Sequence, residues 1–282
     1  GNSKSCTFRV TVSDGVTPWA VCDEFTQVSL GASGEALIFA KTFDDGSGDN
    51  CSPVQFKARR VQTNSCQAVN QFFDKVKFCC ADVGDTVDVI LRVYDLPVDT
   101  GAVSLTEQEA HSSDCAIRVF VEDKLKPVCL PPLHQTISCG NFDPSLKDHG
   151  AATFADNCCL DKTYELPPNY TQFDTLCNRG TIVRTFRAHD CHGLTSQCTQ
   201  RLIVDYFSSF AVQFPDDVFV NDCDTTNVYG PVPVVYGADC ETVAISHQDK
   251  TSTAGILSCY WIERTWMVVD WCYYNPGLPL IE

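Results

Sequence analysis

The stretch Phe43-Asp44-Asp45-Gly46-Ser47-Gly48-Asp49-Asn50-Cys51 has two shorter counterparts later in the chain. They are Phe154-Ala155-Asp156-Asn157-Cys158 and Tyr236-Gly237-Ala238-Asp239-Cys240. Each copy joins an aromatic residue, a short polar turn with an aspartate, and a cysteine. A motif that returns along one chain is typical of repeat architectures, in which similar units follow one another. The motif therefore predicts an array of small modules.

A second repeated element marks the end of each module. It begins with a cysteine, alternates polar and apolar residues, and ends with an aspartate, as in Cys6 to Asp14, Cys115 to Asp123 and Cys198 to Asp205. This period of two residues predicts a strand with one buried face. The three ends place boundaries near residues 17, 126 and 206.

The boundaries divide the chain into a tail and three modules. Residues 1–17 are expected to be the last strand of a preceding module. Residues 18–126, 127–206 and 207–282 form modules 1, 2 and 3. Module 3 has no closing strand of the repeated type, so we expect that it is truncated or completed by a strand from another chain. Unpaired sheet edges accept such strands, and residues 1–17 would be a natural donor.

The predicted secondary structure is almost entirely β. Short runs rich in Val, Ile, Phe and Thr, bounded by Gly, Pro, Asn and Asp, indicate strands; examples are residues 36–39, 86–94, 181–186 and 264–269. Modules of this size with frequent turns are typical of Ig-like β-sandwiches. We therefore expect an all-β chain of tandem Ig-like β-sandwich modules. Their small cores would gain about 2–4 kcal/mol from each disulfide.

The 18 cysteines indicate an oxidising, extracellular setting. No pair has the C-x-x-C spacing of zinc fingers, iron–sulfur proteins or thioredoxins, so these classes lose their support. The formal net charge of −16 argues against binding to nucleic acid, because phosphate binding needs clustered Lys and Arg. No apolar run reaches the length of about 18 residues that spans a membrane.

Several of these segments together resemble a known family. They are Arg184 to Gly193 with the following Cys198 to Asp205, the opening Pro18-Trp19-Ala20-Val21-Cys22, and the turn 43–51. The chain resembles the cysteine-containing Ig-like repeats, related to HYR modules, of long cell-surface adhesins of Bacteroidota, with SprB-type gliding-motility adhesins as the nearest named group. The resemblance implies a surface-exported stalk or filament, usually exported in that phylum by the type IX route.

Cysteine counts alone do not determine disulfide connectivity, but the repeats suggest pairs within each module. For modules 2 and 3 we expect Cys158–Cys177, Cys240–Cys259, Cys139–Cys191 and Cys223–Cys272. First and last strands would be tied by Cys22–Cys115 and Cys129–Cys198. Cys51 would pair with Cys79 or Cys80, and Cys66 with the other.

Cys79 and Cys80 are adjacent, as are Cys158 and Cys159. Neighbouring residues on a strand point to opposite faces, so adjacent cysteines should belong to different bridges. This assignment leaves Cys6 and Cys159 without a partner. Each would be a free thiol or would form a bridge to another chain.

The first copy of the repeated turn carries candidate metal ligands. Asp44, Asp45, Asp49 and Asn50 provide oxygen atoms on a Gly-rich turn, the kind of ligand that Ca²⁺ prefers. The alternative is a solvated hairpin whose Asp and Asn side chains cap their own backbone. Three aspartates at module ends would either add ligands or serve as polar linker residues: Asp14, Asp123 and Asp205. Ca²⁺ is the one cofactor that the sequence suggests.

Other motifs carry weaker functional signals. His189-Asp190-Cys191-His192 is better explained as a local loop than as a metal or catalytic site, because module 3 has no histidine at the equivalent place. Catalytic motifs such as G-x-S-x-G, H-E-x-x-H or a Walker loop do not occur, so we do not expect an enzyme. Glycan acceptor patterns occur at Asn50, Asn169, Thr86 and Thr175.

Taken together, these features predict a segment of a secreted cell-surface adhesin or extracellular filament. Its partners would be neighbouring modules or copies of the same protein, including by strand donation, and a surface glycan or protein ligand. The alternative is a set of non-catalytic binding or spacer modules attached to a secreted hydrolase. Further repeats in the parent chain would favour the adhesin, whereas a catalytic motif there would favour the hydrolase.

Overall fold

A computed structural model describes residues 1–62, 66–95, 103–104, 111–219, 230–252 and 260–277 of the chain. The chain divides into two compact units. Unit 1 contains residues 1–128, 154–163 and 188–196, and unit 2 contains residues 129–153, 164–187 and 197–282. The division cuts across the modules expected from the repeats, because two segments of module 2 belong to unit 1. The module boundaries remain predictions, and the names modules 1 to 3 keep their ranges.

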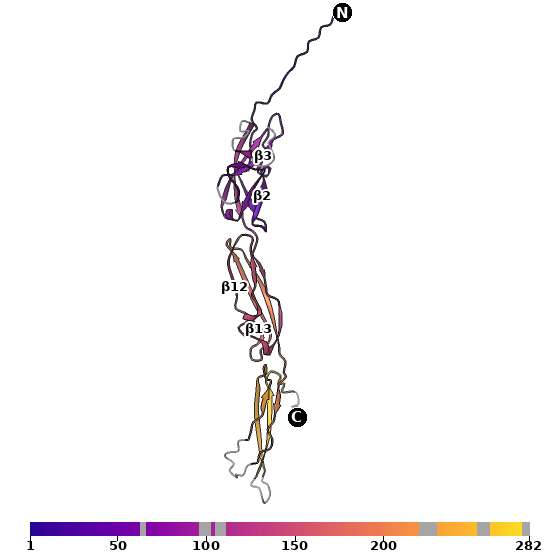
Figure 1. Ribbon diagram of the computed structural model, residues 1–282, viewed down its shortest axis with the longest axis vertical. Coiled ribbons are helices and arrows are strands. Elements are labelled where there is room, and N and C mark those ends of the chain that lie inside the picture. Colours follow the sequence, from indigo (N-terminus) through magenta and orange to yellow (C-terminus); the bar gives the residue numbers. More distant parts are fainter. Residues whose placement is uncertain (63–65, 96–102, 105–110, 220–229, 253–259, 278–282) are drawn as a thin grey trace. The chain divides into compact units, whose positions relative to one another are not determined.

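Module 1, in unit 1, consists of sheets that share one core (Figure 1). The main sheet has the order β1-β8-β6-β3, formed by Phe25–Ser29, Ser112–Glu122, Thr86–Tyr94 and Gln55–Arg60. The described residues of the module also form two antiparallel pairs: β2 (Glu35–Phe39) with β5 (Lys75–Cys79), and β4 (Gln71–Phe72) with β7 (Val103–Ser104). Short 3₁₀ helices follow β2 and β5: η1 (Ala40–Phe43) and η2 (Cys80–Asp82).

The core of module 1 follows from the alternation of side chains along its strands. Every second residue of β6 is buried from Val87 to Val93, and the neighbouring strand β8 buries Ile117, Val119 and Val121 in the same way. Val76 and Phe78 of β5 pack into the same cluster from the other sheet. Because alternate side chains of a strand point to opposite faces, this pattern gives one apolar and one solvated face.

A buried ion pair fixes the end of β5. The Arg60 side chain is fully buried and donates a 2.8 Å hydrogen bond from Nη1 to Asp82 Oδ2 and another to the carbonyl of Lys77. Asp82 Oδ2 also accepts the backbone N–H of Cys79. Because a buried carboxylate requires such partners, Arg60 holds η2 and its cysteines in a defined position.

Module 2 repeats the topology of module 1. Its main sheet has the order β10-β15-β14-β12, and β13 pairs with β14. The parallel pairing of β10 with β15 corresponds to that of β1 with β8. The strands are β9 (Val128–Leu130), β10 (Gln135–Ser138), β11 (Thr153–Ala155), β12 (Leu160–Glu165), β13 (Asn169–Asp174), β14 (Arg179–Asp190) and β15 (Thr195–Asp205), with the 3₁₀ helices η4 (Cys139–Asn141) and η5 (Lys147–His149).

A buried arginine also organises the core of module 2. Arg184 donates hydrogen bonds to Glu165 Oε1 at 2.7 Å and to Gln200 Oε1 at 2.8 Å. The amide nitrogen of Gln200 in turn donates to the carbonyls of Leu133 and His149. Ile182 and Leu202 are fully buried beside this network. The small apolar core is therefore supplemented by satisfied polar groups, as burial of such groups requires.

The described part of module 3 contains two antiparallel pairs, all within unit 2. Strand β16 (Ala211–Gln213) pairs with β17 (Val234–Tyr236), and β18 (Val243–Ser252) pairs with β19 (Trp261–Asp270). Arg264 and Asp249 form a two-pronged ion pair between β18 and β19, with both N–O distances at 2.7 Å.

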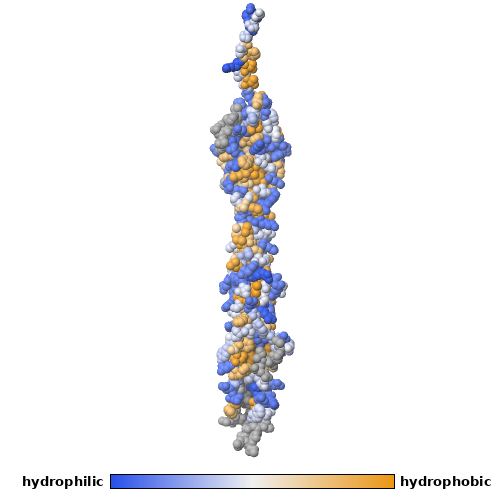
Figure 2. Space-filling view, turned by 90° about the vertical axis from the view of Figure 1, so that its right-hand side faces the viewer, coloured by the Kyte–Doolittle hydropathy of each residue, from blue (hydrophilic) through white to orange (hydrophobic). Residues whose placement is uncertain are grey.

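The described residues confirm the predicted fold class, an all-β chain with disulfides. Residues 6–14 pair with no other strand of the described chain, and their assignment as the last strand of a preceding module stays a prediction. The apolar residues Phe8, Val10 and Val12 of this segment are exposed, and Figure 2 shows orange side chains on this tail at the top of the view. Among the described residues, no helix has the length and apolar character to cross a membrane.

Candidate functional site: the bridged junctions between modules

Seven disulfides connect the described cysteines, and they fall into two groups. Four join cysteines of one predicted module: Cys22–Cys115, Cys66–Cys79, Cys129–Cys198 and Cys159–Cys191. Three join neighbouring modules: Cys80–Cys158, Cys139–Cys240 and Cys177–Cys272. The second group makes the contacts between modules the most distinctive feature of the chain.

Part of the expected pairing agrees with the structure. It contains Cys22–Cys115 and Cys129–Cys198, and it gives Cys66 the partner Cys79. Adjacent cysteines serve different bridges, as the geometry of a strand predicts, since Cys79 and Cys80 have different partners. Cys6 is free and exposed.

Other expected pairs are wrong. The structure excludes Cys158–Cys177, Cys240–Cys259, Cys139–Cys191 and Cys223–Cys272, because one or both members of each have other partners. Cys159 is bonded to Cys191, whereas Cys51 is free. Cys223 and Cys259 lie outside the described residues. The prediction assumed pairing within each module, whereas the turn cysteines Cys158 and Cys240 bond to cysteines of the neighbouring module.

The first junction is the region of unit 1 where residues 154–163 and 188–196 meet module 1. Cys80, held by η2, bonds to Cys158 in the repeated turn, with a Cα–Cα distance of 5.3 Å. Asp156 shapes this turn, because its Oδ2 atom accepts the backbone N–H groups of Cys158 at 2.9 Å and Cys159 at 3.0 Å. The aspartate of the repeated motif thus positions both cysteines that follow it.

Gly34 allows the close approach at the first junction. Its φ of +72° favours glycine, and a Cβ at this position would lie 2.5 Å from the carbonyl oxygen of Asn157 and 2.7 Å from Cys80 Sγ. Asn157 belongs to the bridged turn, and Cys80 is the disulfide partner of Cys158 in that turn. A side chain at Gly34 would therefore force the two modules apart at the disulfide.

Acidic side chains surround the same turn. Asp123, at the end of the module 1 strand β8, accepts a 3.1 Å hydrogen bond from Asn157 Nδ2 through its Oδ1 atom. His192 Nδ1 lies 3.8 Å from Asp123 Oδ2. The backbone N–H of His192 donates to Asp190 Oδ1 at 2.8 Å. The predicted local loop 189–192 thus also contributes to the junction.

The second junction lies in unit 2, where module 3 meets module 2, and it has two bridges. Cys139 at the start of η4 bonds to Cys240, and Cys177 in the β13–β14 turn bonds to Cys272. The Tyr206 hydroxyl donates a 2.6 Å hydrogen bond to Asp270 Oδ2, and the N–H of Cys272 donates to Asp270 Oδ1. Burial, and then the hydrogen bond to Asp270, raise the pKa of the Tyr206 hydroxyl.

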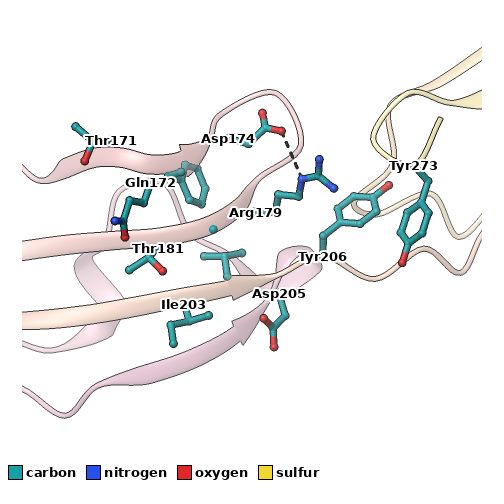
Figure 3. A pocket seen from close by; sticks show the side chains of 12 residues that line it. Thr171, Gln172, Asp174, Arg179, Thr181, Ile203, Asp205, Tyr206 and Tyr273 are labelled. Atoms are coloured by element: carbon teal, nitrogen blue, oxygen red, sulfur yellow. Dashed lines mark ion pairs between the residues drawn. The ribbon is translucent and has the colours of Figure 1, made fainter. Parts of the chain in front are cut away.

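A shallow pocket of about 720 Å³ lies beside the second junction (Figure 3). Arg179 crosses its mouth, forms an ion pair with Asp174 and donates to the carbonyl of Cys272 at 3.1 Å. The rings of Tyr206 and Tyr273 lie next to it, with centroids 5.6 Å apart. Arg179 and Tyr206 thus take part in the contacts of the second junction as well as in the wall of the pocket.

The first copy of the turn differs from the calcium site that its sequence suggests. Asp44 Oδ1 accepts the backbone N–H of Ser47, and Asp45 is exposed. Among the described residues, the oxygens of these two aspartates do not gather with those of Asp49; Asp14, Asp49 and Cys51 instead place their ligand atoms within 4.8 Å of one another. Of the three predicted aspartates, only Asp49 joins this cluster, and Asn50 donates from Nδ2 to Cys51 Sγ.

The pKa values of two residues in this cluster, Asp49 and Cys51, are shifted in opposite directions. Backbone N–H groups of Cys51 and Ser52 donate to Asp49 Oδ2 and lower the pKa of its carboxyl group. Desolvation, followed by the charges of Asp14 and Asp49, raises the pKa of the Cys51 thiol. Cys51 is consequently held in its protonated, less nucleophilic form.

The predicted glycan acceptors are accessible. Asn169, Thr86 and Thr175 are exposed, although Asn169 Oδ1 also accepts the N–H of Thr171. Exposure is a requirement for modification, so glycosylation at these residues remains a prediction.

Comparison with known proteins gives only remote similarities. No protein-family model and no curated protein matches the chain. Solved structures that align with 90% of the chain include protocadherin gamma B7 extracellular cadherin domains 1–4 (14% identity, 68% of that chain, TM-score 0.27) and protocadherin gamma B2 domains 1–5 (12%, 53%, 0.25). The insect immune protein hemolin aligns at 10% identity over 68% of its chain, with a TM-score of 0.21. Because these TM-scores are below 0.5, the fold assignment rests on the strand pairing.

Proposed function

We propose that the chain is part of an extracellular structural or adhesive array, as in a cell-surface adhesin or filament, whose modules are coupled in series by disulfides. The observation that carries this proposal is the set of bridges Cys80–Cys158, Cys139–Cys240 and Cys177–Cys272. Disulfides at this density form and persist in oxidising compartments, which supports export of the protein.

The bridges would give such an array mechanical continuity. A peptide linker alone lets neighbouring modules swing and exposes the connection to proteases. With Cys80 bonded to Cys158, residues 81–157 form a closed loop, and one cut in the linker 124–127 leaves the modules attached. Coupling of this kind suits a stalk that must transmit load between a cell and a surface.

The surfaces of the modules would supply the contacts of the array. Module 3 exposes Trp261, Trp271, Tyr273 and Tyr274, and aromatic side chains of this kind favour protein and sugar partners. Partners would therefore be neighbouring copies, or a surface glycan or protein. Attachment to the cell surface and a part in gliding motility, as in the SprB-type adhesins, belong to this proposal, which assigns the chain no catalytic role.

The test is immunogold electron microscopy of intact cells of the native source, with antibodies raised against the oxidised chain. We expect gold particles along surface threads that keep their width without reductant and become proteolytically fragile with it. Label on isolated globular particles that co-purify with hydrolase activity would overturn the proposal in favour of spacer modules of a secreted enzyme.

A further inference from the structure

The long strand β19 of module 3 has one paired edge among the described residues. An aspartate at or just after the strand end identifies β6 and β14 as its counterparts in modules 1 and 2. In their sheets β6 lies between β3 and β8, and β14 lies between β12 and β15. In the described part of module 3, β19 pairs with β18 alone, and β18 follows the repeated turn as β3 and β12 do. The open edge of β19 is therefore the one that the closing strands β8 and β15 cover in the other modules.

The side chains of β19 that correspond to the buried row of β14 are only half-buried. Trp266 and Val268 lie four and two residues before the closing aspartate, and both are partly exposed. Their counterparts Phe186 and Ala188 are 3% and 0% exposed. Strand β14 has the closing strand β15 beside it. The core of module 3 is thus covered less completely where the equivalent strand is missing from the described residues.

Residues 6–14 show the complementary feature. They repeat the pattern of β8 and β15 from the first cysteine to the aspartate. In β8 the apolar residues at the second, fourth and sixth places after the cysteine are buried, whereas the equivalent Phe8, Val10 and Val12 are 81%, 71% and 86% exposed (Figure 2). A row of exposed apolar side chains on one face of an extended segment marks a surface that binds a partner. The segment has the face of a closing strand without the core that such a strand covers.

The pairing of β6 with β8 gives the register that such a strand would adopt on β19. In that pairing Asp88 lies opposite Arg118. Counted from the closing aspartate of each long strand, the residue equivalent to Asp88 is Glu263. Counted from the first cysteine of each closing strand, the residue equivalent to Arg118 is Arg9. Arg9 and Glu263 are both exposed, and opposite charges that face each other across two strands stabilise their pairing.

We propose that residues 6–14 of one copy pair with β19 of a second copy and complete its module 3 as the closing strand. The partner is a second copy because each described chain carries both halves of the contact, the unpaired strand and the open edge. An added strand gains backbone hydrogen bonds from the edge and buries its apolar face. Two different surfaces meet in this contact, so that copies join head to tail. The inference rests on the array proposed above and specifies how its copies connect.

The test is sedimentation velocity of the purified full chain over a range of concentrations. Every sample carries Cys6→Ser and Cys51→Ser, so that these exposed free thiols cannot link copies. We expect dimers and larger species whose share rises with concentration. Val10→Asp should weaken this association by about tenfold or more, because it places a charge in the buried face of the donated strand. Val10 is exposed in the single copy, so the variant should keep the parent's thermal midpoint at low concentration.

Thr7→Asp is the matched control for Val10→Asp. It adds the same charge to the same segment, but the counterpart of Thr7 in β8, Ala116, is exposed. The added carboxylate would therefore stay in water after the strand is donated. This control should change the association by less than about twofold, as is usual for substitutions on a solvated surface.

An exchange of charges tests the register of the pairing. Arg9→Glu alone and Glu263→Arg alone should each weaken self-association, because like charges would then face each other across the two strands. In an equimolar mixture of the two variants association should return, since every donated strand can again meet the opposite charge on a second copy. Recovery in the mixture would also exclude insertion of the segment into its own chain.

Three results would overturn the proposal: a chain that stays monomeric at every concentration, equal weakening by Val10→Asp and Thr7→Asp, or no recovery in the mixture. The first result would assign the open edge of β19 to another segment of the parent protein. The array itself would survive each of them, because gold labelling of cells tests it separately. Conversely, cells without labelled threads would count against the array while leaving the measured self-association of the purified chain intact.

Discussion

The two junctions differ in the number of disulfides that cross them and in the hydrogen bonding of one aspartate. Each places an aspartate from the end of a long strand beside a bridged turn, Asp190 at the first junction and Asp270 at the second. At the second, the Tyr206 hydroxyl and the N–H of Cys272 satisfy both oxygens of Asp270, and two disulfides cross between modules. At the first, one disulfide crosses and Asp190 Oδ2 has no donor. Both oxygens of Asp270 therefore have donors at the second junction, whereas Asp190 Oδ2 has none among the described residues of the first.

The largest expected effect comes from removing the single bridge of the first junction. In a chain with a specific protease site after Lys126, cleavage should leave one band on a non-reducing gel, because Cys80–Cys158 holds the fragments together. The Cys80→Ser, Cys158→Ser double variant should separate completely. It should also lose about 4 kcal/mol of stability, the value expected for a closed loop of this length.

The matched experiment is at the second junction. With a protease site after Phe207, the Cys177→Ser, Cys272→Ser double variant should remain one band, since Cys139–Cys240 still crosses the cut. The two junctions would not differ in this way if the cleaved fragments of this variant separated. The same would hold if the fragments of the first-junction variant stayed together.

A smaller effect is expected from adding one methyl group at each junction. Gly34→Ala should destabilise unit 1 by about 2 kcal/mol, because its Cβ would collide with the backbone of Asn157 and with Cys80 Sγ in a left-handed conformation. Gly140→Ala should change stability by less than about 0.5 kcal/mol, because the nearest atoms, in Asp239 and Cys240, lie at 3.4 and 3.9 Å. Urea unfolding measures both, and equal effects would refute the tighter fit of the first junction.

A still smaller loss of stability is expected when Asp270 loses one hydrogen-bond donor, so that it resembles Asp190 of the first junction. Tyr206→Phe leaves Asp270 Oδ2 without its donor, as Asp190 Oδ2 is, and should cost about 1–2 kcal/mol. Tyr273→Phe is the control, because the described hydrogen bonds include none from its exposed side chain. The measurement is the thermal midpoint; if both variants melt alike, the Tyr206 hydroxyl does not stabilise the junction.

The features that depend on neighbouring residues, such as strands, could be predicted from the sequence. Period-two patterns located strands such as β6 (Thr86–Tyr94) because each strand encodes its own buried face. Adjacent cysteines had to serve different bridges, since neighbours on a strand point apart. The predictions missed the bridges between modules: Cys158 pairs with Cys80 across a separation of 78 residues, and no local pattern specifies that choice.

The residues of the first junction show the same division. The repeated Asp-Asn-Cys turn indicated which residue types were important, and the aspartates ending each module were recognised as potential ligands. The turn 44–50 attracted attention because it has the most acidic residues, yet Asp44 is engaged within its own turn. Asp190 was missed because it belongs to a loop that resembled an isolated His-Asp-Cys-His motif. The recurrence of an aspartate at the ends of β6, β14 and β19 was the available signal.

The smallest expected effect is a difference between the junctions at alkaline pH. The pKa of Tyr206 is raised above its ordinary value of 10.0 by burial and by Asp270, so the unfolded chain releases this proton at a lower pH than the folded chain. The stabilisation is therefore fully present below about pH 10 and is lost as the pH rises above it. In urea unfolding from pH 9 to 11, the parent protein should lose more stability than Tyr206→Phe, which has no proton to release. Parallel pH profiles would show that the Tyr206–Asp270 hydrogen bond does not stabilise the second junction.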